Sequence, residues 1–171
     1  MRAPREADGH SQYATFLVAG HCLAVRVSEV QEVLRAQQLE PVSLAPKVIA
    51  GLINLRGEII PALEMRTILR LPERQYAEGQ LSVVLQTGMG PVSLQVDEIG
   101  EVMEIEPESL QAPPPNIEDS VRRCLSAVCR TKERLLLVLD VARTVDVTEA
   151  YGQWERERNE KANACNTQTD C

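Results

Sequence analysis

The sequence predicts a mainly β fold in which two small antiparallel barrels pack on one another. Short apolar strands recur at close intervals along the chain, and the two halves of the sequence resemble each other. The 171 residues, 44% hydrophobic and 25% charged, have a globular composition. A chain of this length buries enough surface to form a core without metal or disulfide support.

In the first half of the chain, apolar segments bounded by turn residues predict strands. Gly20-His21 forms a turn between the first two strands, and Arg56-Gly57-Glu58 forms a tight hairpin turn between the last two. Pro61 favours an edge strand or a β-bulge. The predicted strands cover residues 13–19, 22–27, 39–44, 48–55 and 59–63.

Two short helices are also predicted in this half. Ser28 is a good N-cap for a helix over 28–36, because Val30, Val33 and Leu34 would then share one apolar face. A second helix over 64–71 would end at Pro72. A polar connector over 73–79 follows it.

The second half predicts strands over 81–86, 92–96, 121–129 and 135–141. Residues 97–103 resemble the predicted helix that begins at Ser28. Prolines at 113–115 mark a loop. Asp140 is expected to end the last buried strand and to cap the segment that follows.

An internal repeat relates the two halves. Residues 23–33 align with 92–102, and both segments carry a V-x-[SD]-E-[VI]-x-E-V pattern. Residues 59–65 align with 135–141, so the second half carries an insertion, which fits best in its proline-rich loop. The pattern favours a true duplication and two subdomains that share an apolar seam.

Composition excludes several function classes. The 18 basic and 25 acidic residues give a formal net charge of −7, and aromatic residues are only 3%. Such a chain is a poor partner for phosphate backbones and has few platforms for base stacking, so no nucleic-acid partner is expected. No segment resembles a secretory signal or a membrane span. The sequence therefore predicts a soluble, cytoplasmic protein without direct membrane insertion.

The chain shows no coordinated set of catalytic or metal-binding residues. Its five cysteines are irregularly spaced and lie far from His10 and His21, so no metal and no cofactor are predicted. Cys22, Cys124 and Cys129 are interpreted as small buried hydrophobic residues in a reducing cytosol. An enzyme that uses His21 or a carboxylate pair is the disfavoured alternative, and the prediction is that the protein is not an enzyme.

Recognition of other molecules remains as the expected activity. Residues Val27, Val30, Leu94 and Val96 fall at matching points of the two halves. They either form an apolar interaction surface or belong to the core, and the sequence alone leaves both readings open.

The segment GLINLRGEIIPALEMR at 51–66 resembles the CheW-like family of chemotaxis coupling proteins. The matching positions are Gly51, Asn54, Leu55, Arg56, Gly57, Pro61 and Arg66. The resemblance covers about residues 13–147. It implies two packed, five-stranded SH3-like barrels with short helices and no catalysis. The chain departs from the family at 126–130, where members often carry glycine-rich sequence.

The resemblance also implies partners and a site. It implies a non-catalytic adaptor that couples chemoreceptor (methyl-accepting protein) cytoplasmic tips to the regulatory domain of a CheA-type histidine kinase. Such arrays are membrane-associated or cytoplasmic. The implied partner-binding residues are Val27, Val30, Glu32, Asn54 and Arg56, with Gly57 permitting the turn. The role of Arg56 stays open between a polar contact to the receptor tip and an internal hydrogen bond.

Two alternative functions are also considered for this chain. The alternatives are a diverged CheW-like module in a non-flagellar (twitching or surface-sensing) pathway, or a small-ligand-binding β-barrel module.

Residues 1–12 are expected to be a flexible N-terminus and 13–148 the CheW-like domain, with intertwined subdomains over roughly 13–72 and 80–148. Residues 149–171 are expected to form a charged, partly helical or disordered tail.

Overall fold

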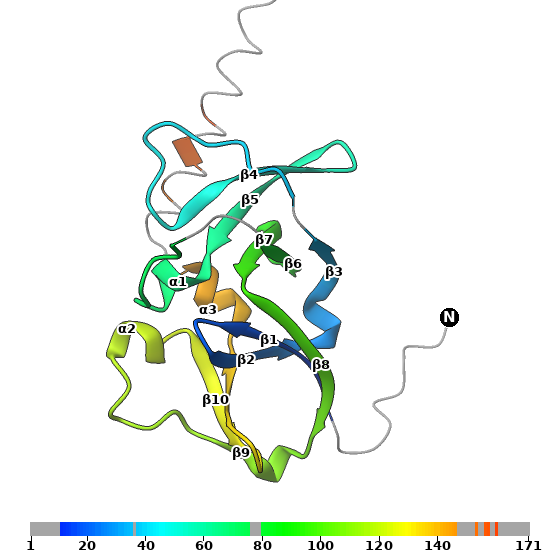
Figure 1. Ribbon diagram of the computed structural model, residues 1–171, viewed down its shortest axis with the longest axis vertical. Helices are drawn as coiled ribbons and strands as arrows, with labels where there is room; N and C mark the ends of the chain where they lie inside the picture. The colour runs from blue at the N-terminus through cyan, green and yellow to red at the C-terminus, as the bar shows by residue number, and fades with distance from the viewer. Residues whose placement is uncertain are drawn as a thin grey trace, which may run out of the picture.

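The computed structural model describes residues 11–35, 37–75 and 80–146, together with positions 153, 156, 157 and 160. The expectations for residues 1–10 and for most of the tail, including Cys165 and Cys171, therefore lie outside the described residues, whereas Ser11 and Gln12, expected in the flexible N-terminus, begin strand β1 (Ser11–Val18). Within them the fold is mainly β, as predicted, with two sheets and a few short helices (Figure 1). In neither sheet do the two edge strands pair with each other, so the SH3-like barrels are open along one side.

The six-stranded sheet has the strand order β8-β1-β2-β11-β10-β9. Its strands are β1 (Ser11–Val18), β2 (His21–Arg26), β8 (Glu98–Ile105), β9 (Leu110–Gln111), β10 (Leu125–Arg130) and β11 (Leu135–Leu139). The five-stranded sheet has the order β3-β6-β7-β5-β4. Its strands are β3 (Val30–Arg35), β4 (Ile49–Leu55), β5 (Glu58–Glu64), β6 (Leu81–Thr87) and β7 (Gly90–Val96).

The helices are short. They are α1 (Met65–Ile68), α2 (Asp119–Arg122) and α3 (Val141–Asp146), with 3₁₀ turns η1 (Val27–Glu29) and η2 (Pro107–Ser109). Of these elements only η1 connects one sheet to the other, from β2 to β3. The division of the strands between the two sheets does not follow the predicted subdomain ranges, 13–72 and 80–148. Strands β1 and β2 lie in the six-stranded sheet with the C-terminal strands, because β2 pairs in parallel with β11.

The ladder register supports the duplication inferred from the sequence. Each sheet contains one parallel pair that joins the two halves: Ala62 faces Ser93 between β5 and β7, and Val138 faces Ala24 between β11 and β2. These two pairs are equivalent positions of the repeat. The antiparallel ladders also break at equivalent points, with β-bulges in β3–β6 and β1–β8 and in both hairpins. Each half thus exchanges strands with the other.

The predicted helix over 28–36 is wrong. After the single turn η1, the chain forms strand β3, in which Val30, Glu32 and Leu34 are half-buried and the intervening residues are exposed. The spacing of Val30, Val33 and Leu34 fits one helical face, but β-branched valines favour a strand, and pairing with β6 places Val33 on the exposed face. The matching segment 97–103 forms β8 for the same reason.

The predicted turn at Arg56-Gly57 and the predicted cap at Asp140 are confirmed. Arg56 and Gly57 have φ values of 54° and 90°, as in a type I′ hairpin turn, and they join β4 to β5. Asp140 caps α3, since its Oδ1 accepts the Arg143 backbone N–H at 2.9 Å. Helix α1 is shorter than predicted, and Glu64 is its N-cap.

Three predicted strands differ in extent or place. Residues 39–44 contribute only an isolated bridge between Glu40 and Leu52. The strand predicted over 121–129 begins later, as β10, after helix α2. Strand β5, which carries Pro61, is not an edge strand, because β4 pairs on one side and β7 on the other. The ladder to β7 starts at Ala62, so no hydrogen bond from Pro61 is needed there.

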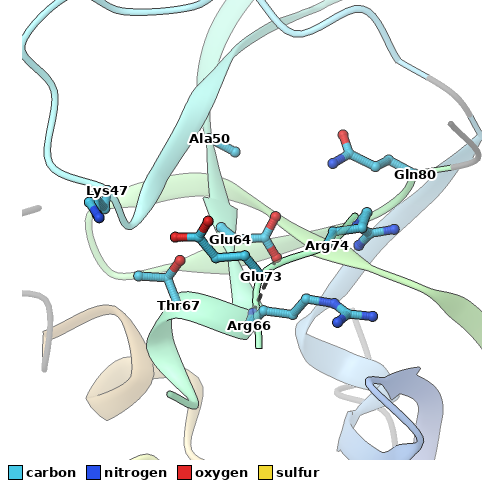
Figure 2. Close-up of a pocket in the computed structure, with 8 residues that line it drawn as sticks. All are labelled: Lys47, Ala50, Glu64, Arg66, Thr67, Glu73, Arg74 and Gln80. Carbon is cyan, nitrogen blue, oxygen red and sulfur yellow. Dashed lines mark hydrogen bonds between the residues drawn. The ribbon is translucent and has the colours of Figure 1, made fainter. Parts of the chain in front are cut away.

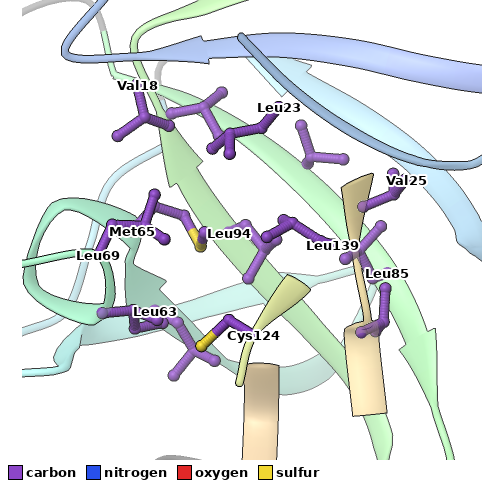
Figure 3. Packing of buried hydrophobic residues seen from close by; sticks show 14 of the residues in the cluster. Val18, Leu23, Val25, Leu63, Met65, Leu69, Leu85, Leu94, Cys124 and Leu139 are labelled. Atoms are coloured by element: carbon purple, nitrogen blue, oxygen red, sulfur yellow. The ribbon is translucent and has the colours of Figure 1, made fainter. Parts of the chain in front are cut away.

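The main core lies between the two sheets, as the predicted apolar seam requires. Strands of both sheets supply its largest buried side chains, and Figure 3 shows Leu23 and Leu139 facing Leu63, Met65, Leu85 and Leu94. Smaller clusters fill each barrel. Cys22, Cys124 and Cys129 are buried free thiols, as predicted. Burial raises the pKa of the Cys22 and Cys124 thiols, which keeps them neutral.

Replacing Leu94 with alanine should lower the free energy of unfolding by about 2–5 kcal/mol, because the cavity opens in the core that both sheets share. Urea unfolding followed by circular dichroism measures the loss. Ile59→Ala, at a solvent-facing position, is the matched control and should change stability by about 0.5 kcal/mol or less. Equal losses in the two variants would contradict a single shared core.

Candidate partner-binding site

The Asn-Leu-Arg-Gly segment forms the end of the β4–β5 hairpin. The Asn54 side-chain oxygen accepts the Gly57 backbone N–H at 2.8 Å, which closes the turn. Gly57 has positive φ, so it permits the turn as expected. Arg56 also has positive φ, an unusual conformation for a residue with a long side chain. Asn54 therefore has a clear structural role, and Arg56 is presented at the tip.

Arg56 forms an ion pair with Glu32. Its Nη2 atom lies 3.2 Å from Glu32 Oε2, and the pair joins the tip of the β4–β5 hairpin to β3. Because β3 and β4 are the two edges of the five-stranded sheet, this contact spans the open side of its barrel. The Arg56 side chain remains 78% exposed and that of Glu32 only 19%. Such an exposed pair contributes about 0–1 kcal/mol to stability.

The two valines that were predicted to contact a partner lie at the start of β3, an edge strand of the five-stranded sheet, and in the turn before it. Val27 begins η1 and Val30 begins β3, and both are half-buried. Val30 packs against the seam between the sheets. Leu94 and Val96, which the sequence left open between surface and core, are buried in that seam. The structure thus joins Glu32 to Arg56 and Asn54 to Gly57, and it places the valines at the η1–β3 junction.

A cluster around Asp97 was missed by the sequence reasoning. Asp97 lies between β7 and β8, where the chain crosses from one sheet to the other. Its Oδ2 atom accepts the Ala19 backbone N–H at 2.6 Å and Arg66 Nη2 at 2.7 Å. Its Oδ1 atom lies 2.7 Å from Arg74 Nη2. Arg66 also donates to the Pro72 carbonyl at 3.0 Å.

The pKa values of two carboxyl groups in this cluster are shifted in opposite directions. Burial raises the pKa of Asp97, but the Ala19 N–H and the guanidinium groups of Arg66 and Arg74 lower it by more, so the net shift is downward. Burial raises the pKa of nearby Glu64, and its hydrogen bond from the Arg66 backbone only partly offsets this. The only signal in the sequence was Arg66, the last residue of the matching motif.

A polar pocket of about 510 Å³ adjoins this cluster (Figure 2). Its lining residues are Lys47, Ala50, Glu64, Arg66, Thr67, Glu73, Arg74 and Gln80. Among the described residues that line it, basic and acidic groups are mixed and there is no His or Cys. The pocket does not include any of the predicted partner-binding residues.

The comparisons with known proteins identify the family. The CheW-like domain model matches residues 12–149, and the chain therefore belongs to the CheW-like domain family. The chemotaxis protein CheW of Treponema pallidum is 27% identical over 138 residues, covering 78% of this chain and 81% of that protein. The chemotaxis protein CheW of Bacillus subtilis is 24% identical over 131 residues, covering 77% and 84%.

A solved structure has the same fold. The scaffolding protein TtCheW from Thermoanaerobacter tengcongensis superposes with a TM-score of 0.73 at 21% identity, covering 81% of this chain and 94% of that one. Its membership of the CheW-like domain family makes the chain a CheW-like chemotaxis adaptor, and it is not an enzyme. Among the residues that the structure describes, no helix is long and apolar enough to cross a membrane.

Replacing Asp97 with asparagine should destabilise the fold by about 2 kcal/mol or more at pH 7, because two largely buried guanidinium groups lose their counter-charge. The pKa of Asp97 is lowered in the folded state, so its stabilisation is present above the unfolded-state pKa of about 4 and is lost as the pH falls through the folded-state pKa.

The stability difference between the native chain and Asp97→Asn should therefore shrink below about pH 4. Urea unfolding at a series of pH values from 7 to 3 measures it. The raised pKa of Glu64 acts with the opposite sign in both proteins and largely cancels in the difference. A difference that stays constant down to pH 3 would contradict a stabilising Asp97 carboxylate.

Proposed function

We propose that this chain is a cytoplasmic adaptor that couples chemoreceptor tips to the regulatory domain of a CheA-type histidine kinase in a chemosensory array. An adaptor must present separate surfaces to two partners. The observation that carries the proposal is that the duplicated fold exposes apolar side chains at equivalent positions of both halves. Recruitment to the array then follows from binding to the receptors.

The equivalent exposed positions occur on two strands of each barrel. Val33 on β3 and Val102 on β8 are 45% and 60% exposed, and they occupy matching ladder positions, facing Val83 and Ala14. Ile59 on β5 and Leu135 on β11 are 49% and 42% exposed and also match in the repeat. Exposed apolar groups on both barrels support two docking surfaces, one on each half.

Residues Val27, Val30, Glu32, Asn54 and Arg56 are proposed to contact a partner on the first of these halves. The Arg56 guanidinium makes one contact, to Glu32, and most of it faces solvent. Its remaining N–H donors suit a carboxylate of the partner. Asn54 holds the hairpin tip that presents it. The half-buried Val27 and Val30 add apolar contact area.

The direct test is a pull-down with purified protein, a receptor signalling-tip fragment and a kinase regulatory domain from the same source. The proposal predicts that one complex contains all three components. Capture of neither partner by a folded sample would overturn the proposal. Capture of only one would contradict the coupling role.

Arg56→Ala should impair kinase coupling by at least about tenfold while it changes the free energy of unfolding by about 1 kcal/mol or less. Val30→Asp should also impair coupling, because it places a charge at the proposed apolar contact. Arg35→Ala removes an equal charge from the other end of β3 and is the matched control. Receptor-dependent kinase activity measures coupling, and circular dichroism checks the fold. If folded Arg56→Ala and Val30→Asp both activated the kinase as well as the native chain does, the contact assignments would be refuted.

A further inference from the structure

The six-stranded sheet carries a groove of about 430 Å³. The groove lies between β8 and the β10–β11 turn, and β1 and β2 form its floor. Its charged lining residues are Glu98, Glu101, Glu133 and Arg134, and its apolar lining includes Ile99, Met103 and Leu136. Carboxylates therefore outnumber cations in the groove.

Glu101 is the repeat counterpart of Glu32. Both residues lie at the β-bulge of an edge strand: Glu32 follows the break in the β3–β6 ladder, and Thr15 Oγ1 donates to the Glu101 carbonyl at 2.7 Å where β8 bulges against β1. In the five-stranded barrel, the neighbouring hairpin tip supplies Arg56 to Glu32. The counterpart of Arg56 in the six-stranded barrel is Lys132.

The second barrel does not reproduce the ion pair. Over the described ranges, Glu101 forms no ion pair with Lys132 or with Arg134, and Lys132 is not among the groove residues. The turn is held differently, since Thr131 Oγ1 donates to the Arg134 carbonyl at 2.8 Å. Arg134 lies beside the Cys22 thiol. Among the described residues, no cation forms an ion pair with Glu101.

We propose that this groove takes an arginine side chain from a partner protein, which pairs with Glu101 as Arg56 pairs with Glu32. A planar guanidinium suits a carboxylate, and its methylene stem suits the apolar walls at Ile99, Met103 and Leu136. β8 is an edge strand, so an extended partner segment has free backbone groups to pair with. The inference rests on the proposed function, because the partner is taken to be a protein.

The geometry disfavours a metal ion as the occupant. In the part of the chain that the structure describes, no group of three or more His, Cys, Asp or Glu side chains could hold one. The three groove carboxylates are thus too far apart to form a coordination shell, whereas a side chain that enters from outside can use them as a negative rim.

The test uses an acetylated and amidated Gly-Arg-Gly peptide, titrated into the ¹⁵N-labelled full chain. We expect saturable shifts at Thr15, Gly100 and Thr131, with an affinity on the order of millimolar. Glu101→Gln should weaken binding by about tenfold, because it removes a charge-assisted contact. Glu104→Gln, on the same strand but outside the groove, should bind like the native chain. The spectra themselves show whether each variant is folded.

Three results would overturn the inference: no saturable shifts in the native chain, equal binding by Glu101→Gln, or equal binding of the matching Gly-Glu-Gly peptide. The experiment contains neither receptor nor kinase. Peptide binding without a three-component complex would therefore contradict the proposed function alone, and a complex without peptide binding would contradict only this inference.

Discussion

The ion-pair cluster at Asp97 constrains the whole arrangement. Asp97 stands where the chain leaves β7 and enters β8, and its carboxylate binds the turn after β1, helix α1 through Arg66, and the segment that carries Arg74. Its backbone N–H donates to the Leu17 carbonyl. These contacts fix the crossing between the sheets from both sides. The equivalent position in the other half of the repeat is Ser28, which has no carboxylate. The ion-pair cluster therefore has no counterpart at Ser28.

The exchange of strands between halves explains how so small a chain forms two barrels. Each barrel has few interior positions, and the parallel pairs β2–β11 and β5–β7 bring both halves into one core. The two barrels then differ. The Glu32–Arg56 pair spans the open side of one barrel, and the other keeps a groove beside Glu101. The symmetric scaffold thus presents two chemically distinct edges, which suits a protein with two partners.

Local sequence patterns predicted much of the fold but few of the contacts at the site. Period-two apolar segments and the Arg56-Gly57 turn predicted most strands, and the repeat predicted the shared seam. The helix expected at 28–36 is wrong because Val30, Val33 and Leu34 fit one helical face, whereas pairing with β6 makes the segment a strand with Val33 on its exposed face. Arg66 and Asp97 are 31 residues apart, and no local signal links them. Glu32 and Arg56 were both singled out, but their ion pair needs the curvature of the sheet.

Coupling as proposed requires that separate surfaces of the chain bind the receptor and the kinase. Isothermal titration calorimetry tests it most directly, with a receptor-tip fragment titrated into the free chain and into the chain saturated with the kinase regulatory domain. Two separate surfaces predict that the receptor fragment binds in both titrations with an affinity that is equal or higher in the presence of the kinase domain. Loss of receptor binding in the saturated sample would show that the partners compete for one surface and would contradict the account.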